Sequence, residues 1–150
     1  MGFSSKYDAA TPLVAELYAI REGLTMAVDY DIQNIELETD AEILVKLLKN
    51  LDDTYHHDLS PVLNDVACLM SRFRSIEFCH IPRNTNKVAH CFAQYAFCME
   101  VGHKMFLNPP PFARVAYEGN LEGLKTLPDL NKLELYLAIK EEAYRRTRGY

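Results

Sequence analysis

Apolar residues recur at helical spacing soon after the start of the chain. Thr11 and Pro12 are typical of a helix start, because a capping hydroxyl is followed by proline at the first helical position. The apolar residues then follow one helical face, at Leu13, Leu17, Ile20, Leu24 and Ala27. The pattern predicts an amphipathic helix that ends at about Tyr30.

Two segments show the alternation typical of strands, and three more show helical spacing. From residue 32 to 39, Ile35, Leu37 and Thr39 alternate with glutamates, and Pro82 ends a second apolar run over residues 75 to 81. Helical stripes lie within residues 40–51, 60–73 and 86–99. The order helix, strand, helix, helix, strand, helix favours an α/β fold with a short parallel sheet flanked by helices.

The two strands need a further partner, since a stable sheet normally has three or more strands. The strand from Ile32 to Thr39 is expected to pair with the same strand of a second molecule, or with the segment from Phe112 to Tyr117 folded back as an added strand. We therefore expect a homodimer or a partner protein bound through this strand edge. If the C-terminal region covers the edge instead, a monomer is expected.

The character of the chain changes after Gly102. Residues 108–111 (Asn-Pro-Pro-Pro) form a stiff break, residues 118–128 are loop-like, and residues 129–148 predict a final helix with basic residues in its last turns. The predicted organisation is one domain over residues 1–103, followed by a proline-rich linker and a C-terminal helix over residues 104–150.

Composition narrows the class of protein. The chain has 150 residues, 49% hydrophobic and 25% charged, as in a single globular domain. No apolar stretch approaches the roughly 20 residues of a membrane span, and the N-terminus lacks a signal core, so we expect an intracellular protein, cytoplasmic or nuclear. The net charge of −5 gives no overall attraction to phosphate backbones. The four cysteines form no C-x-x-C pair, which disfavours a zinc site.

Two carboxylates occupy positions where a catalytic or ligand-binding role is possible. Glu16 lies inside the apolar stripe of the first helix, where a carboxylate is unfavourable unless it is paired or binds a ligand. The alternative is a boundary glutamate in the favourable half of a helix. Asp40 stands where a strand ends and a helix begins, the place at which open α/β sheets bind ligands. The alternative is an acid that stabilises the first helical turn.

Four motifs resemble those of a known family, both in their residues and in their order along the chain. They are Ala15-Glu16-Leu17 with Glu22-Gly23-Leu24, I-E-L-E-T-D at 35–40, F-C-H-I-P-R at 78–83, and Asn86 with Val88 and Ala89. Together they resemble, from about Gly2 to Met99, the plant ribonuclease H-like domain of the reverse-transcriptase-like type. The resemblance implies a ribonuclease H-like fold. In that family four carboxylates hold two magnesium ions that cut the RNA strand of an RNA–DNA hybrid, and Glu16 and Asp40 match two of them.

The sequence departs from the family at the other two carboxylates. The family's first aspartate lies on a first strand in an Asp-Gly-Ala context, whereas this chain begins at what resembles the end of the third strand. The fold expected here therefore lacks the family's first strands. The lead-in through Asp8 is polar and has no strand pattern. Where the family has Asn-x-x-Ala-Asp, this chain has His90 after Ala89.

His90 is expected to face the same crevice as Glu16 and Asp40, where an imidazole could transfer a proton or favour a softer metal. The alternative is an exposed helix histidine. The resemblance thus implies a remnant site of Glu16, Asp40 and His90 that binds Mg²⁺ or Mn²⁺ weakly at its two carboxylates, with no cofactor required.

Three functions follow from these observations. The first is a ribonuclease H-like module without nuclease activity that self-associates or binds another protein. The second is an active, divalent-metal-dependent ribonuclease on RNA–DNA hybrids. The third is nucleic-acid binding without cleavage, through basic residues expected to cluster at one end of the sheet; the alternative there is an ordinary solvated face. The basic residues are Arg72, Arg74, Arg83 and Lys87.

Overall fold

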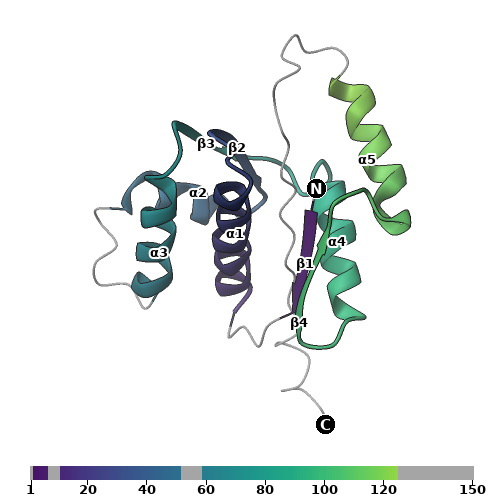
Figure 1. The fold of residues 1–150 in the computed structure, drawn as a ribbon, viewed down its shortest axis with the longest axis horizontal. Helices are drawn as coiled ribbons and strands as arrows, with labels where there is room; N and C mark the ends of the chain where they lie inside the picture. The colour runs from purple at the N-terminus through teal and green to yellow at the C-terminus, as the bar shows by residue number, and fades with distance from the viewer. Residues whose placement is uncertain (1, 7–10, 52–58, 125–150) are drawn as a thin grey trace.

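The structure is a computed structural model that describes residues 2–6, 11–51 and 59–124 (Figure 1). The elements follow in the order β1 (Gly2–Lys6), α1 (Pro12–Asp29), β2 (Asn34–Thr39), α2 (Glu42–Lys49), α3 (Ser60–Met70), β3 (Ser75–His80), α4 (Lys87–Phe97), β4 (Gly102–Phe106) and α5 (Pro111–Leu124). The helices and strands predicted between residues 12 and 97 are confirmed.

Strands β2 and β3 form the predicted parallel pair. They run in register from Asn34 opposite Ser75 to Thr39 opposite His80. Helices α1, α2 and α3 cover this pair, because the apolar stripes of the three helices meet the inward residues of the strands in one core. The buried members of this core are Leu17, Ile20, Leu24, Leu37, Leu44, Val45, Leu48, Leu63, Val66 and Phe78.

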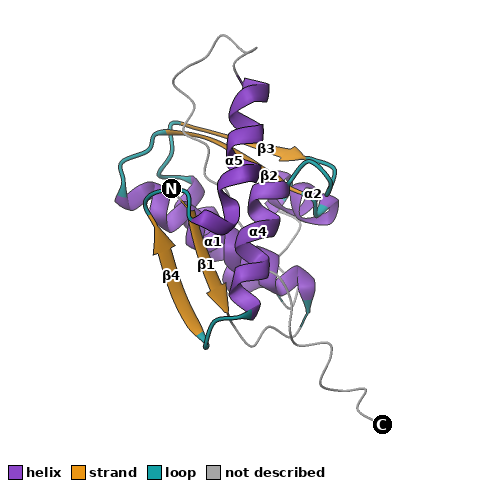
Figure 2. Ribbon diagram, turned by 90° about the vertical axis from the view of Figure 1, so that its right-hand side faces the viewer, coloured by secondary structure: helices purple, strands orange, loops and turns teal. Residues whose placement is uncertain are grey.

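A second pair of strands was not predicted from the sequence. β1 and β4 pair in antiparallel fashion, from Gly2 opposite Phe106 to Lys6 opposite Gly102 (Figure 2). Residues 2–6 do not show the apolar alternation of a strand, because two of the buried residues, Ser4 and Ser5, have polar side chains. The Ser4 hydroxyl is satisfied by donating to the carbonyl oxygen of Phe92 at 2.9 Å.

Helix α5 corrects two expectations about the C-terminal region. The segment from Phe112 to Tyr117 is not an added strand, and residues 118–124 are not a loop, since both lie within α5. The three prolines explain the outcome: a proline at the first helical position is compatible with a helix start, and α5 begins at Pro111. The helix predicted over residues 129–148 lies outside the described residues.

An aromatic cluster fixes α5 against α4 and β4. The ring of Phe112 stacks on Tyr95 with centroids 4.5 Å apart, and Phe106 meets both rings edge-on. Phe92 joins the cluster through Phe106, at a centroid distance of 5.4 Å. Such edge-on and stacked pairs add to the burial of apolar area, so α5 is held as part of the same packed unit as α4.

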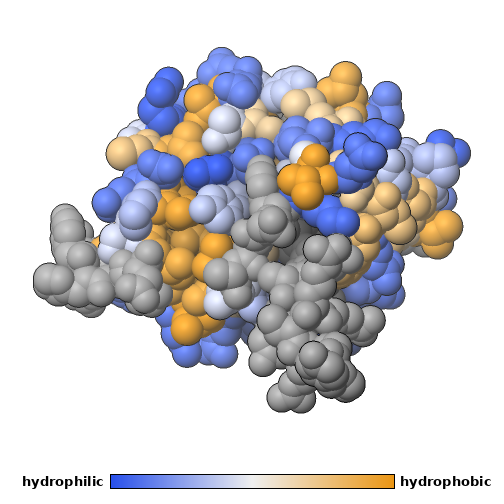
Figure 3. All heavy atoms as spheres, turned by 90° about the horizontal axis from the view of Figure 1, so that it is seen from below, coloured by the Kyte–Doolittle hydropathy of each residue, from blue (hydrophilic) through white to orange (hydrophobic). Residues whose placement is uncertain are grey.

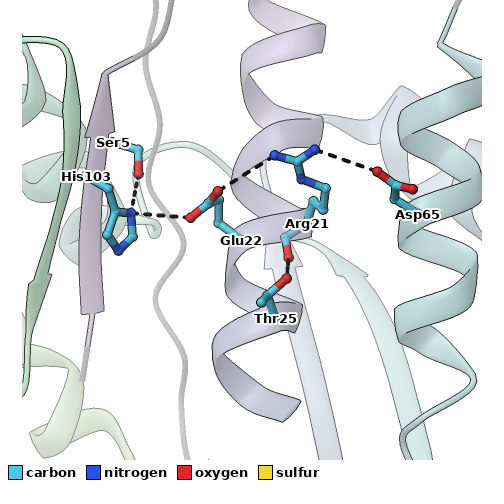
Figure 4. A network of polar contacts seen from close by, with 6 residues as sticks. All are labelled: Ser5, Arg21, Glu22, Thr25, Asp65 and His103. Atoms are coloured by element: carbon cyan, nitrogen blue, oxygen red, sulfur yellow. Dashed lines mark hydrogen bonds and ion pairs between the residues drawn. The ribbon is translucent and has the colours of Figure 1, made fainter. Parts of the chain in front are cut away.

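A row of polar contacts runs from α3 across α1 to the β1–β4 pair (Figure 4). Arg21 on α1 lies 3.7 Å from Asp65 on α3 and 3.8 Å from its neighbour Glu22. Glu22 in turn lies 3.3 Å from Nδ1 of His103 on β4. Helix α1 therefore contacts both α3 and the β1–β4 pair with side chains of alternating charge.

No helix in the described part of the chain is both long and apolar enough to span a bilayer. On the face shown in Figure 3, hydrophobic atoms form separate patches between hydrophilic ones.

Candidate functional site

The end of β2 brings Glu16 and Asp40 together. Asp40 directly follows the last residue of β2, Thr39, which is 3% exposed, and Glu16 lies in the first half of α1. The Thr39 hydroxyl interacts with the Glu16 carboxyl and also accepts the backbone N–H of Ala41 at 3.1 Å. Thr39 therefore ties the helix carboxyl to the start of α2.

The surroundings of Glu16 favour its protonated form. Burial raises the pKa of Glu16 to about 7, and the negative charge of Asp40 acts in the same direction. The Arg83 guanidinium and the Thr39 hydrogen bond oppose this rise. Near neutral pH, Glu16 is therefore about half protonated. This finding agrees with the reasoning that a carboxyl inside the apolar stripe needs a partner.

Arg83 supplies the nearby positive charge. Its Nε lies 3.8 Å from Oδ2 of Asp40. The residue follows Pro82, in the loop between β3 and α4, and its side chain is 64% exposed. Solvent screens a pair of this kind, so the contact contributes little to folding stability. Its relevance is local, because it neutralises charge at the end of β2.

The described residues do not fit a two-magnesium centre. Magnesium prefers several hard oxygen ligands, and ligands must be deprotonated to bind it. Here the Asp40 carboxylate faces the guanidinium of Arg83. Within the part of the chain that the structure describes, no three His, Cys, Asp or Glu side chains form a group that could hold a metal ion.

His90 is not brought together with the carboxylates in such a group. It is exposed on α4, where it lines a groove that also reaches α5. The expected shared crevice with Glu16 and Asp40 is therefore not confirmed as a metal site. The groove is not apparent from the sequence, because residues 111–124, which form α5, do not have a pattern that predicts a helix.

The structure divides the four basic residues between the two ends of β3. Arg72 and Arg74 precede this strand, whereas Arg83 and Lys87 follow it. Six residues of strand span roughly 20 Å, so the expected cluster at one end of the sheet is wrong. Arg83 and Lys87 instead share the groove with His90.

The groove is a cavity of about 1050 Å³ between the β3–α4 loop, α4 and α5. Its lining consists of Arg83, Asn84, Thr85, Lys87, His90, Cys91, Phe112, Val115, Ala116 and Gly119. The β3–α4 loop and α4 contribute the polar part of the lining. The residues of α5 contribute an apolar wall.

A second cluster contains the residue types of a hydrolase triad but not its geometry. Ser5 Oγ lies 2.7 Å from Nδ1 of His103, and the Glu22 carboxylate approaches the same nitrogen at 3.3 Å (Figure 4). A catalytic serine and its supporting acid need different ring nitrogens. Ser5 is also fully buried. This cluster is therefore a structural link between β1, β4 and α1.

Comparisons with known proteins agree with this fold. Residues 1–96 match the family model described as reverse transcriptase-like. The chain is 29% identical over 122 residues to a putative ribonuclease H protein of Arabidopsis thaliana, a match that covers 80% of this chain and 19% of that protein. The chain thus spans about a fifth of the length of this relative.

A solved structure is also similar. The ribonuclease H1 of the halophilic archaeon Halobacterium salinarum superposes with a TM-score of 0.50 at 29% sequence identity. The match covers 55% of this chain and 62% of the archaeal chain.

Proposed function

Because the chain belongs to the reverse transcriptase-like family and has a ribonuclease H-like fold, we propose that it is a ribonuclease H-like binding module without nuclease activity. One observation carries this proposal: the Asp40 carboxylate, which lies beside Glu16, is ion-paired with Arg83. No third metal-binding side chain joins these carboxyls in the described residues.

The chemistry of phosphodiester hydrolysis explains why this arrangement favours a loss of activity. A pair of metal ions clamps the attacking and leaving oxygens, and the ions are held by several ionised carboxylates. Around Asp40, the guanidinium of Arg83 offsets one negative charge. The remaining negative charge is small for a site that must hold two divalent cations.

The adjacency of Glu16 and Asp40 favours a second candidate function. These two carboxyls match two of the family's metal ligands, and the curated relative is named a putative ribonuclease H protein. This alternative is a ribonuclease that uses Mg²⁺ or Mn²⁺ to cut the RNA strand of an RNA–DNA hybrid.

A cleavage assay distinguishes the two. A labelled RNA–DNA hybrid is incubated with the purified chain in Mg²⁺ and then in Mn²⁺, beside the variants Asp40→Asn and Asp29→Asn. Asp29 is an exposed carboxylate at the end of α1, so its variant is the matched control. Equal background in all three proteins supports the binding module. Cleavage that is lost in Asp40→Asn and retained in Asp29→Asn contradicts it and establishes the nuclease.

Self-association through the strand at residues 32–39 stays a prediction. The mass in solution tests it directly: a dimer at micromolar concentration is expected, and a monomer at every concentration contradicts it.

A further inference from the structure

The groove between α4 and α5 combines a basic side with an apolar side. Arg83, Lys87 and His90 lie on the basic side. On the α5 side, Val115 is 84% exposed and stands beside Phe112 and Ala116. An aliphatic side chain so exposed is unfavourable to hydrate, and it lies within reach of unneutralised positive charge.

The apolar side is anchored by packing. Phe112 stacks on Tyr95, and its neighbour Ala113 is fully buried against α4. α5 therefore presents Val115 and Ala116 from a helix that is packed on the rest of the fold. A binding surface on a packed helix loses less conformational entropy when a partner docks than one on an unpacked segment.

Lys87, on the basic side, has no ion-pair partner among the described residues. Among residues 2–6, 11–51 and 59–119, no acidic side chain forms an ion pair with Lys87 or His90, whereas Arg83 is paired with Asp40. The whole chain has a net charge of −5. Positive charge that stays unneutralised in an acidic protein is available to an anionic group of a partner.

We propose that this groove binds an acidic amphipathic peptide segment, with carboxylates at Lys87 and Arg83 and aliphatic side chains against Val115 and Ala116. The cavity of about 1050 Å³ is slightly larger than the roughly 300–1,000 Å³ typical of small-ligand sites, which suits several peptide side chains. This inference names a partner chemistry for the proposed binding role and rests on that role.

A peptide fits these walls better than a nucleic acid does. Bases stack on exposed aromatic faces, but a face of Phe112 is already covered by Tyr95. The exposed part of the wall at Val115 and Ala116 is aliphatic. A phosphate backbone also needs an extended basic track, and Arg72 and Arg74 lie at the opposite end of β3.

Peptide display on the immobilised full chain is the first test. From random twelve-residue peptides, we expect enrichment of sequences in which Asp or Glu stands three or four positions from Leu, Ile, Val or Phe. The most enriched peptide is then labelled and its dissociation constant is measured by fluorescence anisotropy.

Three variants locate the binding site. Lys87→Glu and Val115→Asp should each raise the dissociation constant at least tenfold. Both residues are exposed, so the fold is retained, which circular dichroism checks. Arg72→Glu is the matched control, because it reverses a charge on an exposed residue outside the groove, and it should change the constant less than twofold.

Several results overturn the proposal. These are a selection without acidic amphipathic sequences, equal binding by all variants, or displacement of the peptide by a single-stranded RNA whose own binding is lost in Lys87→Glu. The hybrid cleavage assay is separate from this one. If the chain neither cleaves hybrids nor selects such peptides, the proposal that it lacks nuclease activity stands. Only the proposal that the groove binds a peptide is then contradicted.

Discussion

Arg83 contacts Asp40 with its Nε 3.8 Å from Oδ2, and the same residue lines the groove between α4 and α5. One side chain therefore belongs to two surfaces, the remnant carboxylate pair and the proposed peptide site. A carboxylate that binds in the groove would compete with Asp40 for this guanidinium. Peptide binding and the charge state around Glu16 are thus expected to be coupled.

Opposite substitutions should shift the pKa of Glu16 in opposite directions. Removing the negative charge in Asp40→Asn should lower the pKa from about 7, whereas removing the positive charge in Arg83→Gln should raise it. Carbon-13 NMR titration of the Glu16 carboxyl measures both. Glu42 on α2 serves as the internal reference. Shifts in the same direction for the two variants would contradict the electrostatic assignment.

Stability should fall as Glu16 ionises. Its pKa is about 7 in the folded state and ordinarily 4.5, so the native state binds more protons than the unfolded state between these values. The free energy of unfolding therefore decreases as pH rises through this window, by at most about 3 kcal/mol.

Urea unfolding of the wild type and of Glu16→Gln, at pH 5 and pH 8, isolates this contribution. The stability of the wild type relative to the variant should drop between the two pH values. A constant difference would show that Glu16 ionises normally.

The aromatic cluster should make Phe106 important for stability. Phe106→Ala removes ring contacts with Phe92, Tyr95 and Phe112 and should lower the free energy of unfolding by about 3 kcal/mol. Val101 is 73% exposed, so Val101→Ala should change it by less than about 0.5 kcal/mol. Urea unfolding compares the two. Equal effects would mean that β4 is not packed as described.

Two glycines should respond oppositely to alanine. A Cβ at Gly119 meets no atom within 4 Å, and this residue lies inside α5, so Gly119→Ala should stabilise by about 0.5–1 kcal/mol. Gly102 has a φ of +150°, which L residues rarely adopt, so Gly102→Ala should destabilise. Thermal unfolding shows the signs of both effects. A rise in Tm for Gly102→Ala would contradict this backbone conformation.

Local signals account for the elements that the sequence predicts well. Helix α1 begins after Thr11, whose side chain accepts the backbone N–H of Val14 at 3.3 Å, as the Thr-Pro start indicates. β2 shows its strand period because one side of it packs on helices. The proximity of Glu16 and Asp40 was implied by the resemblance to the family, whose metal ligands they match, and not by the periodicity of α1.

The remaining features depend on contacts between distant residues. Ser4 and Ser5 are polar, and only their bonds to Phe92 and His103 explain how β1 is buried. The sequence pattern of residues 2–6 gives no sign of these hydrogen-bond partners. Arg72 and Lys87 are likewise separated because β3 runs between them. Their closeness in the sequence does not show this separation.

The pairing of β1 with β4 also bears on how the chain folds. Gly2 pairs with Phe106, so β1 is completed by a strand that lies roughly 100 residues further along the chain. The region that matches the family ends at residue 96 and contains neither β4 nor α5. The boundary of family similarity is therefore not a boundary of folding, because a strand inside the matched region is paired with one outside it.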